Sequence, residues 1–575
     1  MTSRKTTQSF RCDDLLVDCE NFRVHKNGEV IALSPLAFDV LVLLIEHRGS
    51  LITKQDLFDK VWKDTFVTDN ALTRVIKEIR RAIGDEAYTP RYIETVPKRG
   101  YRFKAEVAQV AVTAAADLQQ HIPTMTVLPF KLLASEGDEY LGLGIADALI
   151  TRLSNVRQLI VRPTSAVLKY ATSENDSVAI GREQRTEFVL EGTIRKSNEL
   201  IRTTAQLVNV ADGRLLWAGR FDEEFIDIFS VEDLIAEKVA SALSLKLSSE
   251  ERKLLTKRYT MHSEALEFYL KGRYFANKFT LENFGKAIAA FDRALEFDPN
   301  FALAYAGIAE AYWNAADTFL NPREAMQKSK AAALKAVAAD DSLAEGHAYL
   351  ACAKYSLDWD WIGLEHEYRR AIELNPGFAQ AYQWFGWCLS AMGRHDEAIA
   401  SLERAKELDP FSLGANWFLS SVYDIARRYD EAIAQAKTLV DLEPHFWGGH
   451  WALGRACADG QDYPQAITAY EMAAALGTSP WIKGSLAEAH ALNGETDKAR
   501  SLLGELKAQE REGYVPGFFL ALVHLALGEH DEAFDSLEKA YEQHDGGLPL
   551  INVYKPLDCV RDDPRLRSLI ARIGL

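Results

Sequence analysis

The chain has 575 residues, of which 48% are hydrophobic and 26% are charged. This composition is ordinary for a folded globular protein, and the length predicts three or more domains. A net charge of −17 argues against binding of nucleic acid over the whole surface. The charge is unevenly distributed, however. Residues 1–105 carry 18 Lys and Arg against 15 Asp and Glu, hence +3, and the remainder carries 48 against 68, hence −20. This asymmetry indicates one DNA-facing module on an acidic body.

Cysteine usage and hydropathy predict the compartment. The six cysteines form no CxxC pair and have no histidine cluster at metal-ligand spacing, so we predict no metal site and no cofactor. Cys352, Cys388 and Cys457 lie in apolar helical patterns, where a small buried thiol in a reducing compartment is expected. The N-terminus has no apolar leader, and no run of 18 apolar residues occurs. We therefore expect a cytoplasmic protein without membrane contact.

The first elements are a hairpin and two helices. Asn-Gly at 27–28, between apolar residues, is the strongest short hairpin signal. Ser34-Pro35 combines an N-cap with proline at the first helical position, which predicts a helix through Glu46. The sequence TKQD at 53–56 resembles a capping box, with Asp in place of Glu or Gln, and predicts the start of a second helix.

Thr68–Phe103 predicts a third helix followed by a hairpin with a basic tip. An apolar stripe recurs at helical spacing: Leu72, Ile76, Ile79 and Ile83. The opposite side gathers four polar residues: Asn70, Arg74, Lys77 and Arg81. Gly84 suits the left-handed residue that ends a helix, and strands at 91–96 and 101–107 flank the turn Pro97–Gly100. A basic helical face is by itself more often a solvated surface than a binding site. A turn carrying Lys98 and Arg99 directly after it favours contact with phosphates.

These elements together resemble the OmpR/PhoB-type DNA-binding domain, a winged helix-turn-helix of the α+β class, assigned to residues 1–107. The resemblance is carried by the third helix and by the strings NGEVIALSPLAFDVLVLLIEHRGSLITKQDLFDKVW and YIETVPKRGYRF. It implies that the third helix enters the major groove of double-stranded DNA and that the hairpin, or wing, contacts the adjacent minor groove or backbone. By position it implies base-edge contacts from Asn70, Thr73, Arg74 and Lys77, and phosphate contacts from Arg81, Lys98 and Arg99. Glu78 departs from the basic pattern of the family and would either repel phosphate or accept from a cytosine.

Residues 108–122, AQVAVTAAADLQQHI, predict a linker that is too short to span a bilayer and is interrupted by Asp117. An α/β middle domain is expected over residues 123–247. Its predicted strands and helices are, in order, 125–130 (strand), 142–156 (helix), 159–162, 187–194, 201–210 and 214–217 (strands), and 234–247 (helix). The strings VLPF, EYLGLGIADALITRL, FVLEGTIR and TAQLVNVADGRLLWAGRFDEE resemble the TolB amino-terminal-like domain, which implies a fold and no particular ligand.

The middle domain lacks the residues of an enzyme or a phosphoacceptor. Gly142-Leu-Gly144 is not followed by the third glycine of a dinucleotide-binding loop, because position 147 is Asp. A response-regulator receiver needs an acidic pair after its first strand, and Phe130 is followed by Lys-Leu-Leu-Ala. No catalytic constellation occurs elsewhere, so we predict that the chain is not an enzyme.

From residue 263 to about 548, after a helical linker at 248–262, the chain repeats with a period of 34. Equivalent helices begin at Ala398, Ala432 and Ala466, and Ala499 and Ala533 follow 33 and 34 residues later. This period resembles the tetratricopeptide repeat and implies an all-α solenoid of about eight units. Residues 549–575 are interpreted as a terminal cap.

A tetratricopeptide solenoid presents a groove lined by the first helix of each unit. The resemblance places six residues on that face: Gln383, Trp387, Trp417, Ser421, Trp451 and Arg455. Most aromatic residues of such an array belong to its stacked core. Large aromatics beside an arginine would also suit a protein or peptide partner.

Two functions remain in competition. The first is a sequence-specific transcriptional regulator that resembles HilA/CadC-like regulators but has neither a receiver nor a membrane span; oligomerisation on DNA is left open. The alternative is a tetratricopeptide interaction scaffold whose winged helix does not bind DNA. Basic residues in family register, above all Arg74, Lys77, Lys98 and Arg99, favour the first.

Overall fold

A computed structural model of the protein describes all residues except 1–8, 13–14, 19–22, 27–28, 32–34, 62–68, 86–88, 97–98, 106–107, 111–121, 134–137, 172–175, 198–199, 225–227, 246, 256, 279 and 317–319. The chain divides into two compact units, Met1–His121 and Ile122–Leu575. Each unit is described by itself below.

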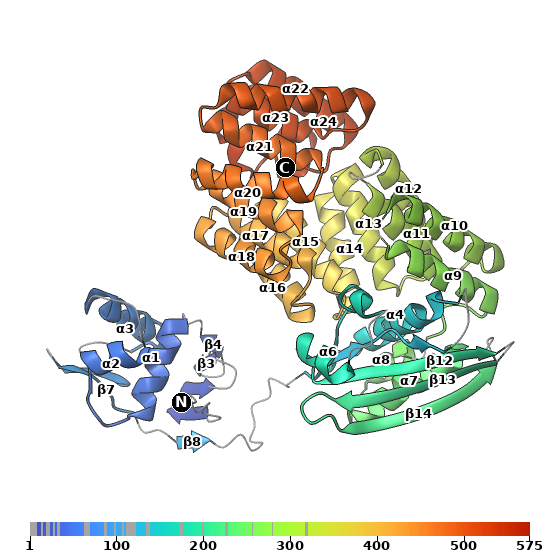
Figure 1. The fold of residues 1–575 in the computed structure, drawn as a ribbon, viewed down its shortest axis with the longest axis horizontal. Helices are drawn as coiled ribbons and strands as arrows, with labels where there is room; N and C mark the ends of the chain where they lie inside the picture. Colours follow the sequence, from blue (N-terminus) through green and yellow to red (C-terminus); the bar gives the residue numbers. More distant parts are fainter. Residues whose placement is uncertain are drawn as a thin grey trace. The chain divides into compact units, whose positions relative to one another are not determined.

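The described residues of the first unit form two small sheets and three helices, among them α1, α2 and α3 (Figure 1). One sheet has the strand order β4-β3-β2-β1-β8 and the other has the order β5-β7-β6. The elements are β1 Ser9–Cys12, β2 Leu15–Asp18, β3 Arg23–Lys26, β4 Glu29–Ile31, α1 Pro35–Glu46, β5 Ile52–Thr53, α2 Lys54–Val61, α3 Asp69–Ile83, β6 Ile93–Val96, β7 Gly100–Phe103 and β8 Ala108–Val110. This is the winged-helix arrangement expected from the sequence.

Local signals in the sequence account for several of these boundaries. Strands β3 and β4 pair antiparallel with Lys26 opposite Glu29, and the Asn-Gly pair predicted to form the turn between them lies outside the described residues. The capping box at the start of α2 is confirmed. Thr53 Oγ1 accepts from the Asp56 amide at 3.1 Å, and Asp56 Oδ2 accepts from the Thr53 amide at 3.2 Å. The hydrogen bonds from Thr53 lower the pKa of Asp56.

The predicted linker begins later than expected. Residues 108–110 form β8, which pairs antiparallel with β1 so that Ser9 faces Val110. Three residues are too few to show the alternation by which a strand is detected in a sequence. The rest of the predicted linker up to 121 lies outside the described residues.

The second unit begins with a mixed α/β domain. Its sheet has the order β11-β9-β12-β13-β14, with β10 beside β12. Strands β9, β11 and β12 are parallel, whereas β12, β13 and β14 form an antiparallel meander. The strands are β9 Thr124–Val127, β10 Lys131–Leu132, β11 Ile160–Val161, β12 Phe188–Ser197, β13 Leu200–Asn209 and β14 Leu215–Glu224. The helices are α4 Tyr140–Ser154, α5 Thr164–Val167, α6 Ser177–Glu183, α7 Ile228–Ala242 and α8 Ser249–Leu255.

Two elements of this domain differ from the sequence prediction. The last strand continues to Glu224 instead of ending at Trp217, because Arg220 and Asp222 pair across the meander with Thr204 and Arg202. The segment expected to be a helical linker packs against the domain: Leu255 is fully buried and its carbonyl accepts from Arg152 at 3.1 Å.

Eight antiparallel helix pairs follow in the described part of the chain (Figure 1). They are α9 Ser263–Ala276 with α10 Leu281–Phe297, α11 Ala302–Ala315 with α12 Pro322–Ala339, α13 Ala344–Ala353 with α14 Trp361–Leu374, α15 Ala379–Ala391 with α16 His395–Leu408, α17 Leu413–Ile425 with α18 Tyr429–Leu442, α19 Trp447–Asp459 with α20 Tyr463–Leu476, α21 Pro480–Leu492 with α22 Thr496–Glu512, and α23 Gly517–Ala526 with α24 His530–Gln543. Small buried residues such as Ala398, Ala432 and Ala466 allow the paired helices to approach closely.

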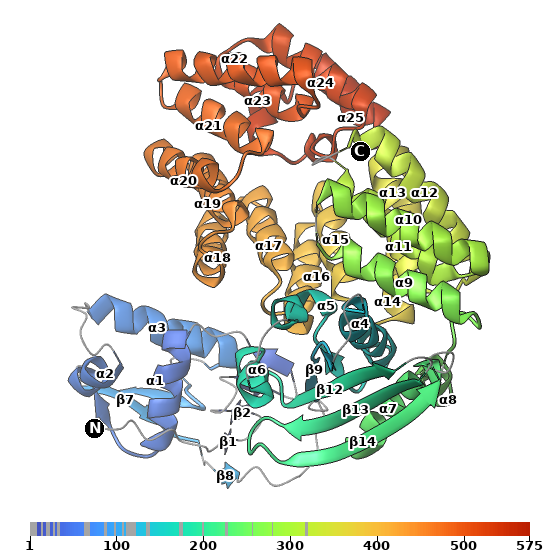
Figure 2. The same cartoon turned by 45° about the vertical axis from the view of Figure 1, so that its right-hand side comes forward.

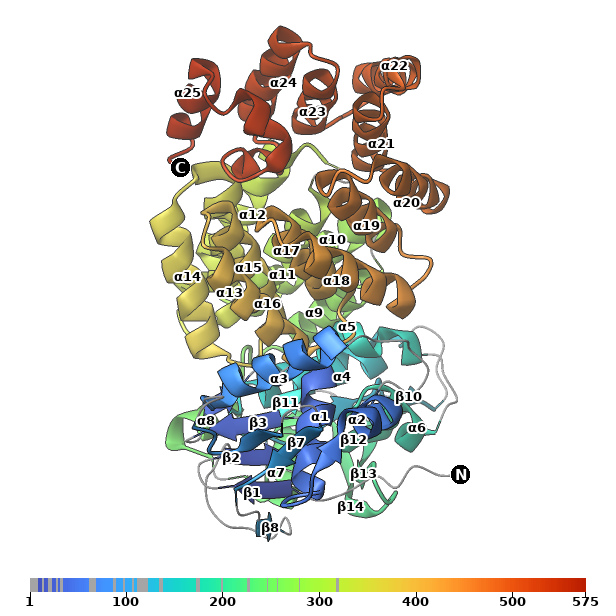
Figure 3. The ribbon, with the colours of Figure 1, turned by 90° about the vertical axis from the view of Figure 1, so that its left-hand side faces the viewer.

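The C-terminal residues fold back onto the array instead of only covering its end. Two 3₁₀ turns, Leu548–Leu550 and Lys555–Val560, precede α25 Pro564–Arg572. The Trp361 indole donates to the Ile573 carbonyl at 2.7 Å, and the His544 ring stacks on Trp359 at 4.6 Å. Arg323 of α12 also donates to the Glu542 carbonyl at 3.3 Å, so the last helices lie beside α12 and the start of α14 (Figure 2, Figure 3).

Candidate DNA interface and repeat groove

Helix α3 has one buried face and one exposed face. Leu72, Ile76, Ile79 and Ile83 are each at most 1% exposed and form the core with α1. On the outer side, Thr73, Lys77 and Arg81 are exposed. The helix ends at Gly84, whose φ of +65° is the left-handed conformation that glycine adopts without strain. The outer face therefore carries two cationic side chains and one hydroxyl at helical spacing.

Three of the predicted DNA contacts have side chains that the structure does not describe. Asn70 and Arg74 lie within α3, but their side chains are outside the described residues, and so is the whole of Lys98. Glu78, which departs from the basic pattern, is partly buried. Of the predicted DNA contacts, the structure therefore describes the side chains of Thr73, Lys77 and Arg81 on the helix and of Arg99 on the wing.

A buried polar connection fixes α3 to the wing. Arg80 donates from Nη2 to the Ile93 carbonyl at 2.7 Å and to Thr95 Oγ1 at 2.9 Å. The carboxylate of Asp85 accepts from three consecutive backbone amides, Arg91, Tyr92 and Ile93, at 2.7, 3.0 and 2.9 Å. Neither Arg80 nor Asp85 is among the DNA contacts predicted from the sequence. Both set the angle between the helix and the hairpin that follows it.

The wing turn is equally constrained. The Arg99 amide donates to the Val96 carbonyl at 3.0 Å, and the Arg99 side chain is exposed. Gly100 has φ +155°, and a Cβ built there would lie 1.9 Å from the Ile52 carbonyl oxygen. Any other residue at position 100 would therefore displace β5 from the hairpin.

An open hollow of about 540 Å³ lies between α3 and the wing. Four cationic residues line it, Lys54, Lys77, Arg80 and Arg81, against one carboxylate, Asp85. The Asp85 carboxylate is already occupied by backbone amides, so the hollow presents positive charge. A surface of this kind is suited to the phosphate backbone, with the exposed helix face beside it directed at base edges.

The six predicted groove residues do not share one environment. Gln383, Trp387, Trp417 and Ser421 are partly exposed. Trp451 and Arg455, which were expected on the same open face, are 6% and 2% exposed. The Trp451 indole donates to Ser485 Oγ at 3.0 Å, and Arg455 donates to Glu488 at 2.7 Å and to Asp459 at 2.5 Å. These two side chains join neighbouring repeats instead of facing solvent.

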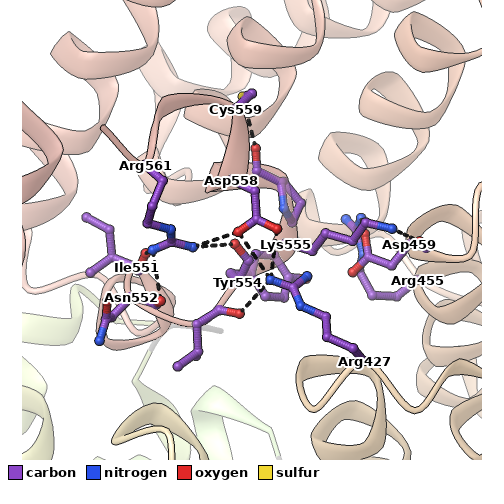
Figure 4. Close-up of polar contacts among 12 residues, drawn as sticks. Arg427, Arg455, Asp459, Ile551, Asn552, Tyr554, Lys555, Asp558, Cys559 and Arg561 are labelled. Atoms are coloured by element: carbon purple, nitrogen blue, oxygen red, sulfur yellow. Dashed lines mark hydrogen bonds and ion pairs between the residues drawn. The ribbon is translucent and has the colours of Figure 1, made fainter. Parts of the chain in front are cut away.

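The physical reason is the chain's own C-terminal segment, residues 545–561, which lies against this part of the inner face (Figure 4). Tyr554 packs on Phe518 at 5.7 Å between ring centroids, and the Arg455 guanidinium lies 5.3 Å from the Tyr554 ring. Lys555 donates to the Asp459 carbonyl, and Arg427 pairs with Asp558 at 3.0 Å. No periodic signal in the sequence predicts this docking.

Burial also shifts the ionisation of the groove carboxyls. Desolvation is the largest effect and raises the pKa of Asp424, and the nearby charge of Asp459 raises it further. Desolvation likewise raises the pKa of Glu488, although Arg455 opposes the shift. For Arg455 itself desolvation acts to lower the pKa, but Asp459 and Glu488 outweigh it and the guanidinium stays charged.

The described ranges of the chain contain no group of three or more His, Cys, Asp or Glu residues arranged to hold a metal ion. Among the described helices, none is long and apolar enough to cross a membrane.

Family models match three parts of the chain. Residues 28–103 match the model described as transcriptional regulatory protein, C terminal. Residues 119–238 match the second domain of HilA/YgeH-like transcriptional regulators. Tetratricopeptide models match residues 367–400, 423–480, 480–505 and 515–539.

Individual relatives match over different extents. The transcriptional regulator HilA of Salmonella typhimurium is 25% identical over 70% of this chain and 71% of its own length. A Rhizobium meliloti protein whose name provisionally assigns it as adenylate cyclase 3 is 31% identical over 41% of this chain and 40% of its own length. The solved DNA-binding domain of Escherichia coli CadC is 33% identical, with 18% of this chain and 97% of that domain covered and a TM-score of 0.17.

The matched segments coincide with the three kinds of domain in the structure: residues 28–103 with the helices and wing of the first unit, 119–238 with the α/β sheet, and 367–539 with the helix pairs. The chain therefore combines an OmpR/PhoB-type winged-helix domain, a HilA-like second domain and C-terminal tetratricopeptide repeats, and HilA and CadC are its homologues.

Proposed function

We propose that this protein is a transcriptional regulator that binds promoter DNA through α3 and the wing. The observation that carries the proposal is the exposed basic face of α3 beside a cationic hollow and a basic wing residue, in a domain of the OmpR/PhoB type. A bound duplex would place its major groove over Asn70, Thr73, Arg74 and Lys77. Its backbone would lie along Arg81, Lys98 and Arg99.

The experiment that tests this proposal is selection of bound sequences from a pool of random double-stranded DNA, followed by sequencing. We expect a single enriched motif that the full chain binds at least about 10³-fold more tightly than unrelated duplex. Recovery of an unenriched pool would instead favour the interaction scaffold with a winged helix that does not bind DNA.

For the repeats we propose a protein or peptide partner on the part of the inner face that remains accessible, around Gln383, Trp387, Trp417 and Ser421. Half-exposed tryptophans in neighbouring repeats support this choice, because aromatic anchors dominate many interfaces. We expect Trp417→Ala to lose the partner in a pull-down from the source cell's extract while DNA binding persists.

We also propose that the chain acts in the cytoplasm, where its DNA would be, and that it is not an enzyme. Support for the second point is that the matching family models describe regulatory and repeat domains and none describes a cyclase. Because one relative is named as an adenylate cyclase, an assay of cyclase activity is the direct test of this point. Purified chain incubated with ATP and divalent metal should form no cyclic AMP above a no-protein control.

A further inference from the structure

A small cavity of about 50 Å³ lies on the inner face of the repeats, lined by residues of five helices and of the C-terminal segment. Six aromatic rings line it: Trp387, Trp451, Trp481, Phe518, Phe519 and Tyr554. The rings pack on one another, with Trp481 stacked on Phe519 at 5.3 Å and Trp451 at 6.4 Å from both. By this measure one water needs about 10–15 Å³, so the cavity has room for roughly three to five groups of that size.

The cavity also has one acidic residue whose hydrogen bonding is incomplete. Asp424, from the end of α17, lines the cavity and is 2% exposed. Its Oδ1 has no hydrogen-bond partner among the described residues. A buried polar oxygen without a partner is costly, so it marks a place that a ligand group can occupy with gain.

The other charges near Asp424 are already engaged with one another. Arg455 is paired with Glu488 and Asp459, and Arg427 is paired with Asp558. Lys555 directs its ammonium group at the Asp459 carbonyl and over the Tyr429 ring (Figure 4). None of these cations donates a hydrogen bond to Asp424 Oδ1, so an incoming cation would be the first partner of that oxygen within the described part of the chain.

From this combination we infer that the cavity is a binding site for a small methylated ammonium ion, held between the aromatic faces with its charge beside Asp424. Aromatic faces attract cations through their quadrupole, and rings that surround a methylated ammonium also bury its methyl groups. A carboxylate at the base adds the opposite charge. Glycines 546 and 547 and Leu550 of the C-terminal segment form one wall, which leaves no room for a bulky attachment to the ammonium group.

This assignment goes beyond the proposed function, since it gives the repeat domain a small-molecule input. Because the C-terminal segment forms a wall of the site, a bound cation would also hold that segment in place. The ion is identified only by its chemistry: a compact organic cation with methyl groups on nitrogen. Free cations and methylated lysine side chains share that chemistry, and the size of the cavity favours the free ion.

Isothermal titration calorimetry on the full chain without DNA tests the site. Tetramethylammonium is the charged probe, and tert-butanol, which has the same number of non-hydrogen atoms but no charge, is the matched control. We expect saturable binding of tetramethylammonium and at least about tenfold weaker binding of tert-butanol. Equal binding of the two compounds, or no heat of binding at millimolar tetramethylammonium, would overturn the assignment. The titration contains no DNA, so a failure of the cation to bind would leave the DNA-binding proposal intact.

Variants separate a binding role from a structural one. Asp424→Asn keeps the shape of the side chain, so we expect it to fold with an unchanged midpoint and to weaken tetramethylammonium binding about tenfold or more. Trp481→Phe should weaken binding several-fold because indole is the stronger cation acceptor. The control is Trp447→Phe, which alters the same aromatic cluster at a residue outside the cavity lining. Unchanged affinity in Asp424→Asn, or equal losses in the two tryptophan variants, would contradict the proposal.

The proton on Asp424 predicts how binding depends on pH. Because burial and Asp459 raise the pKa of Asp424, the free carboxyl holds a proton to higher pH than usual, and the bound cation must displace it. The affinity for tetramethylammonium should therefore be lower at about pH 5 than at about pH 8, with proton release visible as a buffer-dependent heat. The charged and titratable groups around Asp424 are Arg427, Arg455, Asp459, Glu488, Tyr554 and Lys555. A trimethyllysine peptide that binds more tightly than tetramethylammonium would overturn the choice of a free ion.

Discussion

At the scale of single residues, Asp85 has a larger structural role than any charged side chain on the outer face of α3. Its carboxylate accepts three backbone N–H groups at the start of the wing and lies 3.8 Å from Arg80 Nε. Buried amides without an acceptor are expensive, and three of them lie next to one another here. Asp85 and Arg80 therefore set the angle between α3 and the hairpin without needing to touch DNA. Simultaneous contact with the major groove and with the DNA backbone depends on that angle.

We expect Asp85→Ala to lower the free energy of unfolding of the winged helix by about 3 kcal/mol, because three donors lose their acceptor. Hydrogen exchange of peptides covering 69–103, measured in the full chain, should show the loss directly. Glu94→Ala is the control: its ion pair with Arg102 at 3.3 Å is partly exposed, and such pairs contribute about 0–1 kcal/mol. Equal exchange in the two variants would mean that Asp85 does not secure the wing.

At the scale of elements, equivalent positions in successive repeats have different roles. Trp417 and Trp451 are 34 residues apart, yet Trp417 is partly exposed whereas Trp451 is 6% exposed and hydrogen-bonded to Ser485. The C-terminal segment covers the later repeats and leaves the earlier ones accessible. Position within a repeat therefore does not by itself determine whether an aromatic residue binds a partner or builds the core.

We predict that Trp451→Ala costs about 3–5 kcal/mol of stability, as expected for a buried aromatic side chain. Trp417→Ala should cost clearly less, because part of its surface is exposed and its buried Nε1 has no hydrogen-bond partner among the described residues. Urea unfolding of both variants and of the wild type measures the difference. If the two substitutions lower the free energy of unfolding equally, the C-terminal segment does not stabilise the repeats that it covers.

The elements that the sequence predicts well are those with a strong period. Leu72, Ile76, Ile79 and Ile83 predict α3 and its buried face, and the recurrence of Ala398, Ala432 and Ala466 predicts the helix pairs. The missed features are non-periodic. Asp85 acts through backbone amides six to eight residues away, and Tyr554 docks on helices about a hundred residues earlier in the chain. Neither contact leaves a local pattern, so only the folded chain reveals them.

At the scale of the whole molecule, the C-terminal end of the second unit contacts its third helix pair, α13 and α14. His544 stacks on Trp359, the His544 ring contacts the Ser356 carbonyl at 3.1 Å, and Trp361 donates to Ile573. The contacts on the early repeats fall at a π-helical turn, Lys354–Asp358, and the left-handed Trp359 that follows it. Such irregular turns often mark a functional position in a helix. The last repeats and the third repeat therefore support each other directly.

Removal of residues 544–575 should loosen α13, α14 and the turn between them, because they lose the contacts with His544 and Ile573. We expect faster hydrogen exchange at 344–374 and no change at 69–103, which lies in the other unit. Arg565→Ala is the control, since its ion pair with Asp531 is exposed and should contribute little. Unchanged hydrogen exchange at 344–374 in the truncated protein would show that the contacts of His544 and Ile573 do not stabilise the third helix pair.

In the proposed function, α3 contacts the base edges of DNA and the wing contacts the phosphate backbone of the same duplex. The most direct measurement is a salt titration of binding to the selected site and to unrelated duplex, for wild type, Arg74→Ala, Arg99→Ala and Arg102→Ala. Arg74→Ala should weaken binding to the selected site by about 1–3 kcal/mol and relax one position of the motif. Arg99→Ala should weaken binding to all sequences alike and reduce the salt slope by about one. Arg102→Ala removes the same charge from a residue paired with Glu94 and should change neither. If Arg74→Ala and Arg99→Ala both bind like wild type, α3 and the wing are not the DNA interface.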